Sequence, residues 1–430
     1  MRSVAFRAAT LTLERIERRR QSLASALHES LRRAGVRLPE DREDALALTL
    51  SALRYFPEAD LLLSKHGLYS IPLRRKCAFR VAYAALRTRV TSRDKLEIVR
   101  GGLLPGRLWS MVSPGSVERV EALKEELPKR ERLAVEYATP PWIVGHLLEK
   151  LGRSETIRLL KALWKQPVWI RINTLRGEER KILKRLKRLG VRLREDGDLP
   201  YIYEVLSPST GLTLLEPFIE GYAIKEDKGS AIVVHTLQPE YGDLIYDATA
   251  APGVKTSHIY QLAKTEIVAG DISVKRVHSM ALLKAKLRYD AHIAVMDSRS
   301  PPLRRAFNKA LVDAPCTNSG AMGSDPGLRL ALWKEVDVER YFKTQIALLR
   351  AVARTVRPRG YVVYSTCSLL SREGEEVVEH IVRDGTYDVE AVGWGSPGYP
   401  GYSISKRVCR LYPHVHRTIA FFIAKLRVRR

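Results

Sequence analysis

Apolar residues recur at three- and four-residue spacing from Leu11 to about Glu125, for example in LASALHESLRRAG and DREDALALTLSALRYF. This spacing is that of one buried face of an α-helix. Helix-stopping residues such as Gly35 and Pro57 divide the region into short segments. The pattern therefore predicts an all-α bundle over residues 1–125.

The pattern becomes mixed over residues 126–226. Helical segments are followed by a strand, VWIRINT (168–174), and by a basic helix, EERKILKRLKRLG (178–190). We expect linker helices and a small α+β subdomain here. On the basic helix, Ile182 and Leu186 belong to an apolar stripe, and six Lys and Arg residues cover the other faces. Two interpretations of these cations stay open, an ordinary solvated face or a surface that contacts phosphates.

Strands and helices alternate from Gly242 onward. The expected strands are DLIYDA, TEIVAGDI, HIAVMD, KALVDA and GYVVYSTC, with helical segments between them. This alternation predicts a parallel sheet covered on both faces, a doubly wound Rossmann-like α/β domain over residues 227–430. The final apolar segment, RTIAFFIAKLRV (417–428), predicts one more strand, antiparallel at the sheet edge or between other strands.

Charge narrows the choice of partner. The chain has 430 residues, and 73 Lys and Arg against 48 Asp and Glu give a formal net charge of +25. Such an excess favours a polyanion. Nucleic acid is preferred to a membrane, because the sequence has neither a Lys-rich amphipathic helix with exposed aromatic residues nor an apolar run that could span a bilayer.

The cysteine spacing and the number of asparagine and glutamine residues indicate the cellular compartment and the kind of source organism. Four cysteines, all far apart, fit neither a CxxC zinc cluster nor a disulfide scaffold. We therefore expect reduced thiols, no metal and a cytoplasmic location. Only three asparagines and five glutamines occur, which favours a thermophilic source.

Candidate ligand-binding residues lie where the predicted strands end, because ligands bind beyond the carboxyl ends of strands in open α/β sheets. The first strand leads into a loop of small residues, DATAAPGVKT, and the next three end at Asp271, Asp297 and Asp313. An acid after the second strand suits a ribose diol. Both the Walker loop and the dinucleotide fingerprint are missing, so a nucleoside ligand such as S-adenosylmethionine fits best.

Two cysteines follow the fourth and fifth strands. Cys316 lies in VDAPCTNSG and Cys367 in VYSTCSLLSREGEE, both polar loops that are expected to face the same cleft. Cys77 and Cys409 fit the alternative of a buried, small apolar residue. The residues alone leave open which of the two cleft thiols reacts first.

With these motifs the chain resembles the Sun-type (RsmB-like) RNA cytosine-C5 methyltransferases. The resemblance is carried by EYATPPWIVGHLLEKLG, VWIRINTLRG, DATAAPGVKTSHI, VDAPCTNSGAMGSDP, YSTCSLLSREGEEVV and RLYPHVHRTIAFFIAKL. The helical N-terminal region is similar to the NusB-like RNA-binding domain found on one branch of the family. The sequence departs from the family pattern at Val254, where a glycine is usual, at Thr249, where a cysteine is common, and at Ala420.

The resemblance implies a class I methyltransferase domain that uses S-adenosylmethionine and acts on rRNA or tRNA. We also expect a monomer. The resemblance assigns Cys367 as the nucleophile at cytosine C6, Cys316 to product release and Asp313 as the acid at N3 or N4. Position and resemblance together predict the cofactor-binding residues Ala250, Ala251, Pro252, Gly253, Val254, Lys255, Asp271, Arg276, Asp297 and Asp313. We expect Lys255 to pair with the methionine carboxylate. Candidates on the RNA side are Arg171, Asn173 and Lys228.

Two alternative functions stay open. One is a noncatalytic RNA-binding module on a methyltransferase fold, against which the intact Asp313, Cys316 and Cys367 argue. The other is a DNA methyltransferase, which the motif order and the NusB-like region disfavour. In DNA cytosine methyltransferases a Pro-Cys thiol is the nucleophile, so the roles of the two cysteines rest on the family resemblance.

Overall fold

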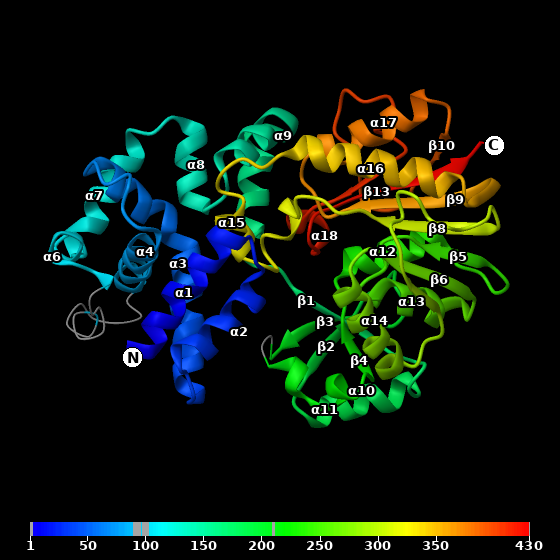
Figure 1. The fold of residues 1–430 in the computed structure, drawn as a ribbon, viewed down its shortest axis with the longest axis horizontal. Helices are drawn as coiled ribbons and strands as arrows, with labels where there is room; N and C mark the ends of the chain where they lie inside the picture. The colour runs from blue at the N-terminus through cyan, green and yellow to red at the C-terminus, as the bar shows by residue number, and fades with distance from the viewer. Residues whose placement is uncertain (1–2, 89–95, 97–102, 209–210, 430) are drawn as a thin grey trace. The chain divides into compact units, whose positions relative to one another are not determined.

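The structure is a computed structural model, and it describes residues 3–88, 96, 103–208 and 211–429. The chain forms two compact units (Figure 1). The first contains residues 1–161 and 321–336, and the second contains residues 162–320 and 337–430. Compactness thus divides the chain after residue 161, and the three-part division at 125 and 226 stays a prediction.

The first unit is helical, as the spacing of apolar residues predicts. Helix α15 (Gly327–Ala331) joins it from the middle of the C-terminal half. The buried Arg329 of this helix donates hydrogen bonds to the carbonyl groups of Tyr137 and Ala138 at 2.8 and 3.1 Å. The other helices with described bounds are α1 (Ser3–Arg19), α2 (Leu23–Ala34), α3 (Pro39–Lys65), α4 (Leu73–Arg87), α6 (Gly106–Trp109), α7 (Pro114–Glu125), α8 (Lys129–Tyr137) and α9 (Pro141–Ala162).

The expected stop at Pro57 is wrong, because α3 continues through this residue. A proline inside a helix costs roughly 3 kcal/mol through its missing N–H and its ring. Leu53, Phe56 and Leu62 are buried on both sides of it, and burial of each such side chain contributes about 1.5–3 kcal/mol. Tertiary packing therefore outweighs the local penalty.

The second unit begins with a small antiparallel sheet in the order β2-β3-β1-β4. The predicted strand is β1 (Val168–Ile172), and the predicted basic helix is α10 (Glu179–Arg188). Ile182 and Leu186 of α10 pack against Ile170 and Ile172. The remaining elements are β2 (Arg192–Glu195), β3 (Ile202–Ser207), η2 (Leu212–Leu214), α11 (Glu216–Ile219) and β4 (Ala223–Lys225).

The large sheet has nine strands in the order β11-β12-β13-β9-β8-β5-β6-β7, with β10 paired to β13. The five predicted parallel strands are β5 (Leu244–Asp247), β6 (Glu266–Asp271), β7 (His292–Val295), β8 (Phe307–Asp313) and β9 (Val356–Thr366). The last predicted strand, β13 (Phe421–Val428), is antiparallel and lies between β9 and β12. Short strands that the pattern did not predict are β10 (Tyr387–Glu390), β11 (Ser396–Pro397) and β12 (Cys409–Leu411).

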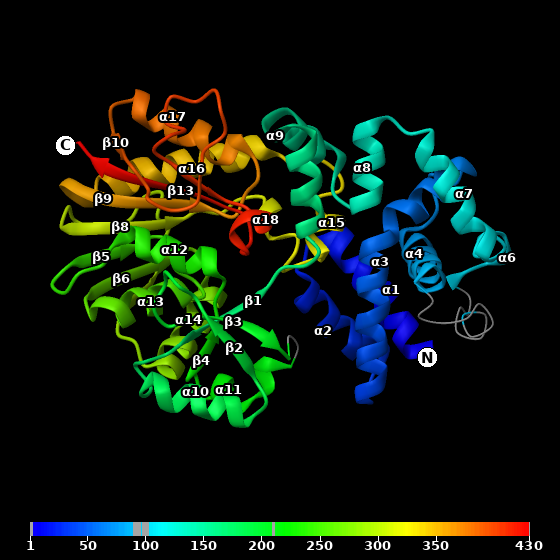
Figure 2. The same cartoon turned by 180° about the vertical axis from the view of Figure 1, so that it is seen from behind.

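Helices cover both faces of this sheet (Figures 1 and 2). Alternate residues of a strand face opposite sides: Leu311 and Val363 pack with the first helical layer, and Val312 and Tyr364 pack with the second. The doubly wound arrangement is thus confirmed. The first layer is α12 (Lys228–Leu237), α13 (Val254–Ala263) and α14 (Val274–Leu287), and the second is α16 (Val338–Ala353) and α17 (Glu375–Arg383).

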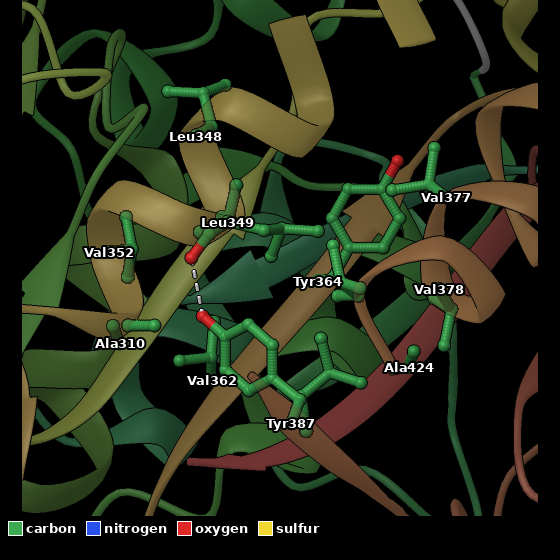
Figure 3. Packing of buried hydrophobic residues seen from close by; sticks show 14 of the residues in the cluster. Ala310, Leu348, Leu349, Val352, Val362, Tyr364, Val377, Val378, Tyr387 and Ala424 are labelled. Atoms are coloured by element: carbon green, nitrogen blue, oxygen red, sulfur yellow. Dashed lines mark hydrogen bonds between the residues drawn. The ribbon is translucent and has the colours of Figure 1, made fainter. Parts of the chain in front are cut away.

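The second layer is fixed by a dense apolar cluster (Figure 3). Tyr387 of β10 is fully buried, and its hydroxyl donates a 2.7 Å hydrogen bond to the carbonyl of Leu349 in α16. The polar end of this ring is therefore satisfied inside the core. This packing holds α16 against β8 and β9, the two strands that carry the cysteine loops.

Candidate active site

The predicted cofactor loop joins β5 to the start of α13. Gly253 precedes the helix with φ of 99°, and a Cβ there would come within 2.5 Å of the Tyr289 hydroxyl. Only glycine fits such a position. The Ala250 amide donates to the Gly270 carbonyl at 2.9 Å, which ties the loop to β6. Backbone amides at the start of α13 are thus available to an anionic ligand group.

Asp247, at the end of β5, lies buried beneath this loop. Its Oδ2 accepts a hydrogen bond from Thr256 at 2.7 Å, and its Oδ1 is buried without a partner among the described residues. Burial raises the pKa of Asp247 to about 6. An unsatisfied carboxylate oxygen favours a cationic ligand group here, and the α-ammonium of S-adenosylmethionine fits this requirement.

The predicted ribose-binding residue Asp271 lies at the end of β6. It is buried, and its Oδ2 is 3.2 Å from Nη1 of Arg276. The Nη2 group of Arg276 donates a hydrogen bond to the carbonyl of Ala251. The structure thus brings these three predicted cofactor residues together. Asp297, past β7, instead forms a 2.6 Å ion pair with Arg299, and this hydrogen bond lowers its pKa. The predicted contact of Asp297 with adenine stays a prediction.

Asp313 connects three elements at the end of β8. Its Oδ1 accepts from Ser365 of β9 and its Oδ2 from Lys255 of α13, both at 2.7 Å. Burial by itself lowers the pKa of Lys255, but the adjacent Asp313 carboxylate outweighs it, and the pKa is raised. Lys255 is therefore a permanent cation that pairs with Asp313. Its predicted contact with a methionine carboxylate stays a prediction.

The two loop cysteines meet at the same edge of the sheet. The Sγ atoms of Cys316 and Cys367 are 3.6 Å apart. Cys316 is buried, whereas Cys367 is partly exposed. The hydrogen bond with Cys367, together with burial, raises the pKa of Cys316 well above its ordinary value, so Cys316 holds its proton at neutral pH. Cys77 and Cys409 are buried elsewhere, as expected, and burial raises the pKa of each to about 12.

A buried carboxylate that the sequence pattern does not reveal joins the two cysteine loops. Glu373 is fully buried and accepts from the Thr317 amide at 2.9 Å, the Thr317 hydroxyl at 2.6 Å and the Ser368 hydroxyl at 2.5 Å. Thr317 and Ser368 each follow one of the two cysteines. Glu373 therefore holds the two thiols in register, although SREGEE has the composition of an exposed helix start.

The three predicted RNA-side residues are engaged within the protein. Arg171 is fully buried, with its Nε 2.6 Å from Glu226 Oε2, and its guanidinium also donates to Ser257 of α13. Asn173 is buried and donates to the carbonyl of Leu287. Lys228 lies 2.5 Å from Asp196. Burial disfavours direct RNA contact by Arg171 and Asn173, which instead hold the small sheet against the cofactor-side helices.

The buried Glu226 is expected to make stability depend on acid pH. Burial by itself raises its pKa, but His258 and Arg171 outweigh it and lower the pKa to about 2. An unfolded glutamate has a pKa of about 4.3. The stabilisation is therefore complete above the unfolded value and is lost as pH falls from about 4.5 to 2, by roughly 3 kcal/mol.

Thermal unfolding between pH 2 and 7 measures this dependence. Glu226→Gln is the matched variant, because it keeps the shape of the side chain and removes its charge. It should unfold at a lower temperature than the wild type at pH 7, and its pH dependence below 4.5 should be shallower. Parallel pH profiles for the two proteins would show that Glu226 is not the responsible group.

Comparison with known proteins agrees with this site. Residues 234–427 match the family model of the 16S rRNA methyltransferases RsmB/F. Ribosomal RNA small subunit methyltransferase B of Klebsiella pneumoniae is 27% identical over 449 aligned positions, which cover 100% of this chain and 98% of that protein. A tRNA (cytosine(72)-C(5))-methyltransferase of Pyrococcus horikoshii is 37% identical over 224 residues, 50% of this chain and 55% of that protein.

Solved structures share the fold. The crystal structure of PH0851 superposes with a TM-score of 0.80, at 24% identity, over 99% of both chains. That of NSun6 from Pyrococcus horikoshii with SFG has a TM-score of 0.61 and 25% identity, over 68% of this chain and 99% of that one. Together with the match to the family model, this fold and the loop after β5 define a Rossmann-like methyltransferase domain.

Together these matches support a Sun-type RNA cytosine-C5 methyltransferase, with the family model covering residues 234–427 and the rRNA relative extending over the whole chain. The protein is an enzyme that methylates RNA, and its methyl donor is S-adenosylmethionine. In the described part of the chain, no cluster of three or more His, Cys, Asp and Glu side chains could hold a metal ion. Among the described helices, none has the length and apolar character needed to cross a membrane.

Proposed function

We propose that this enzyme methylates C5 of a cytosine in ribosomal RNA, with transfer RNA as the second candidate, by covalent catalysis from Cys367. One observation carries the proposal: the Cys367 and Cys316 sulfurs lie 3.6 Å apart on loops that follow β9 and β8, the strand that ends at Asp313. These loops are at the carboxyl end of the sheet, where the cofactor loop also lies.

The chemistry follows from the weak reactivity of the cytosine ring. The Cys367 thiol loses its proton to the Asp313 carboxylate, and the thiolate forms a bond to C6. The electron pair displaced from the C5–C6 double bond is taken up at N3, to which Asp313 would pass that proton. S-adenosylmethionine supplies the methyl group that C5 then attacks. The Cys316 thiol gives its proton to the departing Cys367 sulfur and takes up the C5 proton in its place. Cleavage of the S–C6 bond and loss of the N3 proton to Asp313 then restore the ring. We assign this release to Cys316.

The electrostatics support this division of roles. Cys367 is the more exposed of the two thiols, and its charge contributes to the raised pKa of the Lys255 ammonium. A nearby cation favours a thiolate. Cys316 is buried and holds its proton. The exposed thiol is therefore the better nucleophile, and the buried thiol is suited to a later step.

We assign the cofactor to the loop after β5, with residues 250–255 around the methionine end and Asp271 at the ribose. Arg276 supports Asp271 and Ala251, and Asp297 would lie near the adenine. The buried, unpartnered Oδ1 of Asp247 adds an acceptor for the α-ammonium group. Val254, at the usual place of a glycine, leaves the backbone amides of the helix start available.

The extent of similarity to the two kinds of relative favours one RNA substrate over the other. The likeness to the Klebsiella pneumoniae rRNA enzyme extends over the whole chain, whereas the likeness to the tRNA enzyme covers half of it. We therefore favour ribosomal RNA, and propose that residues 1–125 are a NusB-like RNA-binding domain of a monomeric, cytoplasmic enzyme.

Bisulfite sequencing of total RNA with and without the gene tests the substrate. Cytosines that resist bisulfite conversion only when the gene is present identify the methylated positions. If no cytosine depends on the gene in this way, the proposal is wrong.

Helix α10 is expected to bind RNA phosphates. Arg180, Lys184, Lys187 and Arg188 are exposed and follow one stripe of the helix. Replacing both Lys184 and Lys187 with alanine should weaken RNA binding about tenfold and reduce the slope of log affinity against log salt by about 1.5. Binding titrations at several salt concentrations measure both effects. As a control, replacing the exposed Lys343 and Arg357 with alanine removes the same amount of charge elsewhere. Equal losses of RNA affinity in the two double variants would argue against a specific phosphate-binding surface on α10.

A further inference from the structure

The side chain of Asn318 lies between the two active-site thiols. Cys367 Sγ donates a hydrogen bond to Asn318 Oδ1 over 2.9 Å, and Cys316 Sγ lies 3.5 Å from the same oxygen. The two sulfurs are themselves 3.6 Å apart. A single carboxamide therefore contacts the group that attacks the base and the group that ends the reaction.

The backbone fixes this carboxamide in place. Asn318 has φ of 58°, in the left-handed region that asparagine and glycine adopt most readily. Its neighbours are held by buried hydrogen bonds: Thr317 donates twice to Glu373, and Ser319 Oγ accepts from the Leu369 amide at 2.9 Å. Moving Asn318 away from the thiols would break these bonds, each of which is costly to lose inside a protein.

A carboxamide can serve a cysteine in both of its protonation states. Its oxygen accepts a hydrogen bond from a thiol, and its NH₂ group donates to a thiolate. Rotation about the terminal torsion of Asn318 exchanges the two groups without any backbone change. The N–H to sulfur bond formed with a thiolate is charge-assisted, and therefore stronger than the bond to the thiol. After this rotation the carboxamide nitrogen would face Cys367.

The charged groups around the two thiols explain why a neutral side chain suits position 318. Lys255 of α13 is a cation near enough to interact with the charge of Cys367, and it is already paired with Asp313. Glu373 is the buried acid on the Cys316 side, where its charge disfavours a second thiolate. An acid at position 318 would repel the Cys367 thiolate. A carboxamide of the same shape does not.

We propose that Asn318 is a positioning residue that holds the Cys367 sulfur toward the base and stabilises its thiolate by an N–H hydrogen bond. The inference rests on the proposed role of Cys367 as nucleophile and adds to it the group that prepares this thiol. It also explains why an asparagine, with its tolerance of a left-handed backbone, suits this position between the two loops.

The test measures the thiolate itself, apart from methyl transfer. The full-length enzyme is treated with iodoacetamide at pH 7.5, and the alkylation rate of Cys367 is followed by mass spectrometry of its peptide. Two variants keep the left-handed backbone: Asn318→Gly removes the carboxamide, and Asn318→Asp keeps its shape but adds charge. We expect Asn318→Gly to slow alkylation about tenfold and Asn318→Asp to slow it about tenfold further.

Controls separate this effect from misfolding. Asn308→Ala alters another asparagine of the same unit, at the start of β8, and should leave the rate unchanged. The buried Cys77 and Cys409 report unfolding within the same digest, because they react only when the protein opens. Alkylation of Asn318→Gly at the wild-type rate, or faster alkylation of Asn318→Asp than of Asn318→Gly, would overturn the inference. If Cys367→Ala still transferred methyl groups, the proposed role of Cys367 as nucleophile would be wrong. The alkylation rates would still show whether Asn318 stabilises the Cys367 thiolate.

Discussion

Cys316→Ala is expected to trap the enzyme on its RNA as a covalent adduct. Cys367 can still attack C6 and C5 can still be methylated, but the step that removes the C5 proton and expels the thiolate lacks its side chain. The buried position of Cys316, 3.6 Å from Cys367, places it beside the bond that must break. Incubation with substrate RNA and S-adenosylmethionine, followed by denaturing electrophoresis, should show a shifted band that nuclease digestion removes.

The matched variant is Cys367→Ala, which should lose methyl transfer completely and form no adduct. The double variant Cys316→Ala/Cys367→Ala should behave like Cys367→Ala, because the adduct requires the nucleophile. An adduct that persists in Cys367→Ala and disappears in Cys316→Ala would reverse the two roles. Full methyl transfer by Cys367→Ala would exclude covalent catalysis from this residue.

Asp313→Asn is expected to reduce kcat about 10²- to 10⁴-fold, the usual contribution of a general acid or base. The amide cannot transfer a proton at the N3 edge of the base. It also removes the carboxylate that pairs with Lys255 at 2.7 Å, which leaves a largely buried cation without its charge partner. Steady-state methylation with labelled S-adenosylmethionine measures the loss.

Ser365→Ala is the control for Asp313, because it removes one hydrogen bond to Oδ1 and keeps the carboxylate. It should cost less than about tenfold in kcat. In the Cys316→Ala background, Asp313→Asn should also slow adduct formation, since protonation at N3 accompanies attack at C6. A kcat for Asp313→Asn within tenfold of the wild type would assign the proton to another group.

Local periodicity predicts most of the fold, because strands and helices differ in which positions they bury. It places the five parallel strands and the final antiparallel strand, and it places the cofactor loop and both cysteine loops at strand ends. It fails at Pro57, where burial of Phe56 and its neighbours keeps α3 continuous. The short strands β10, β11 and β12 carry too few residues to show a period.

The partners of the site residues needed the tertiary structure. Arg171 alternates with apolar residues on its strand and resembles a surface cation, yet it is buried against Glu226, 55 positions away. Lys255 was expected at the cofactor and is paired with Asp313, 58 positions away. Glu373 and Asn318 reach the opposite cysteine loop across 56 and 49 positions.

The sequence by itself therefore determined the class of chemistry, through two cysteine motifs and an acid-marked series of strand ends, together with the basic character that suits RNA. Only the tertiary structure decided which thiol is buried, which cation neutralises Asp313 and which side chains hold the two loops together. The physical reason is that periodicity reports which face of an element is buried. The partner of a polar group depends on strand order and on packing between distant segments.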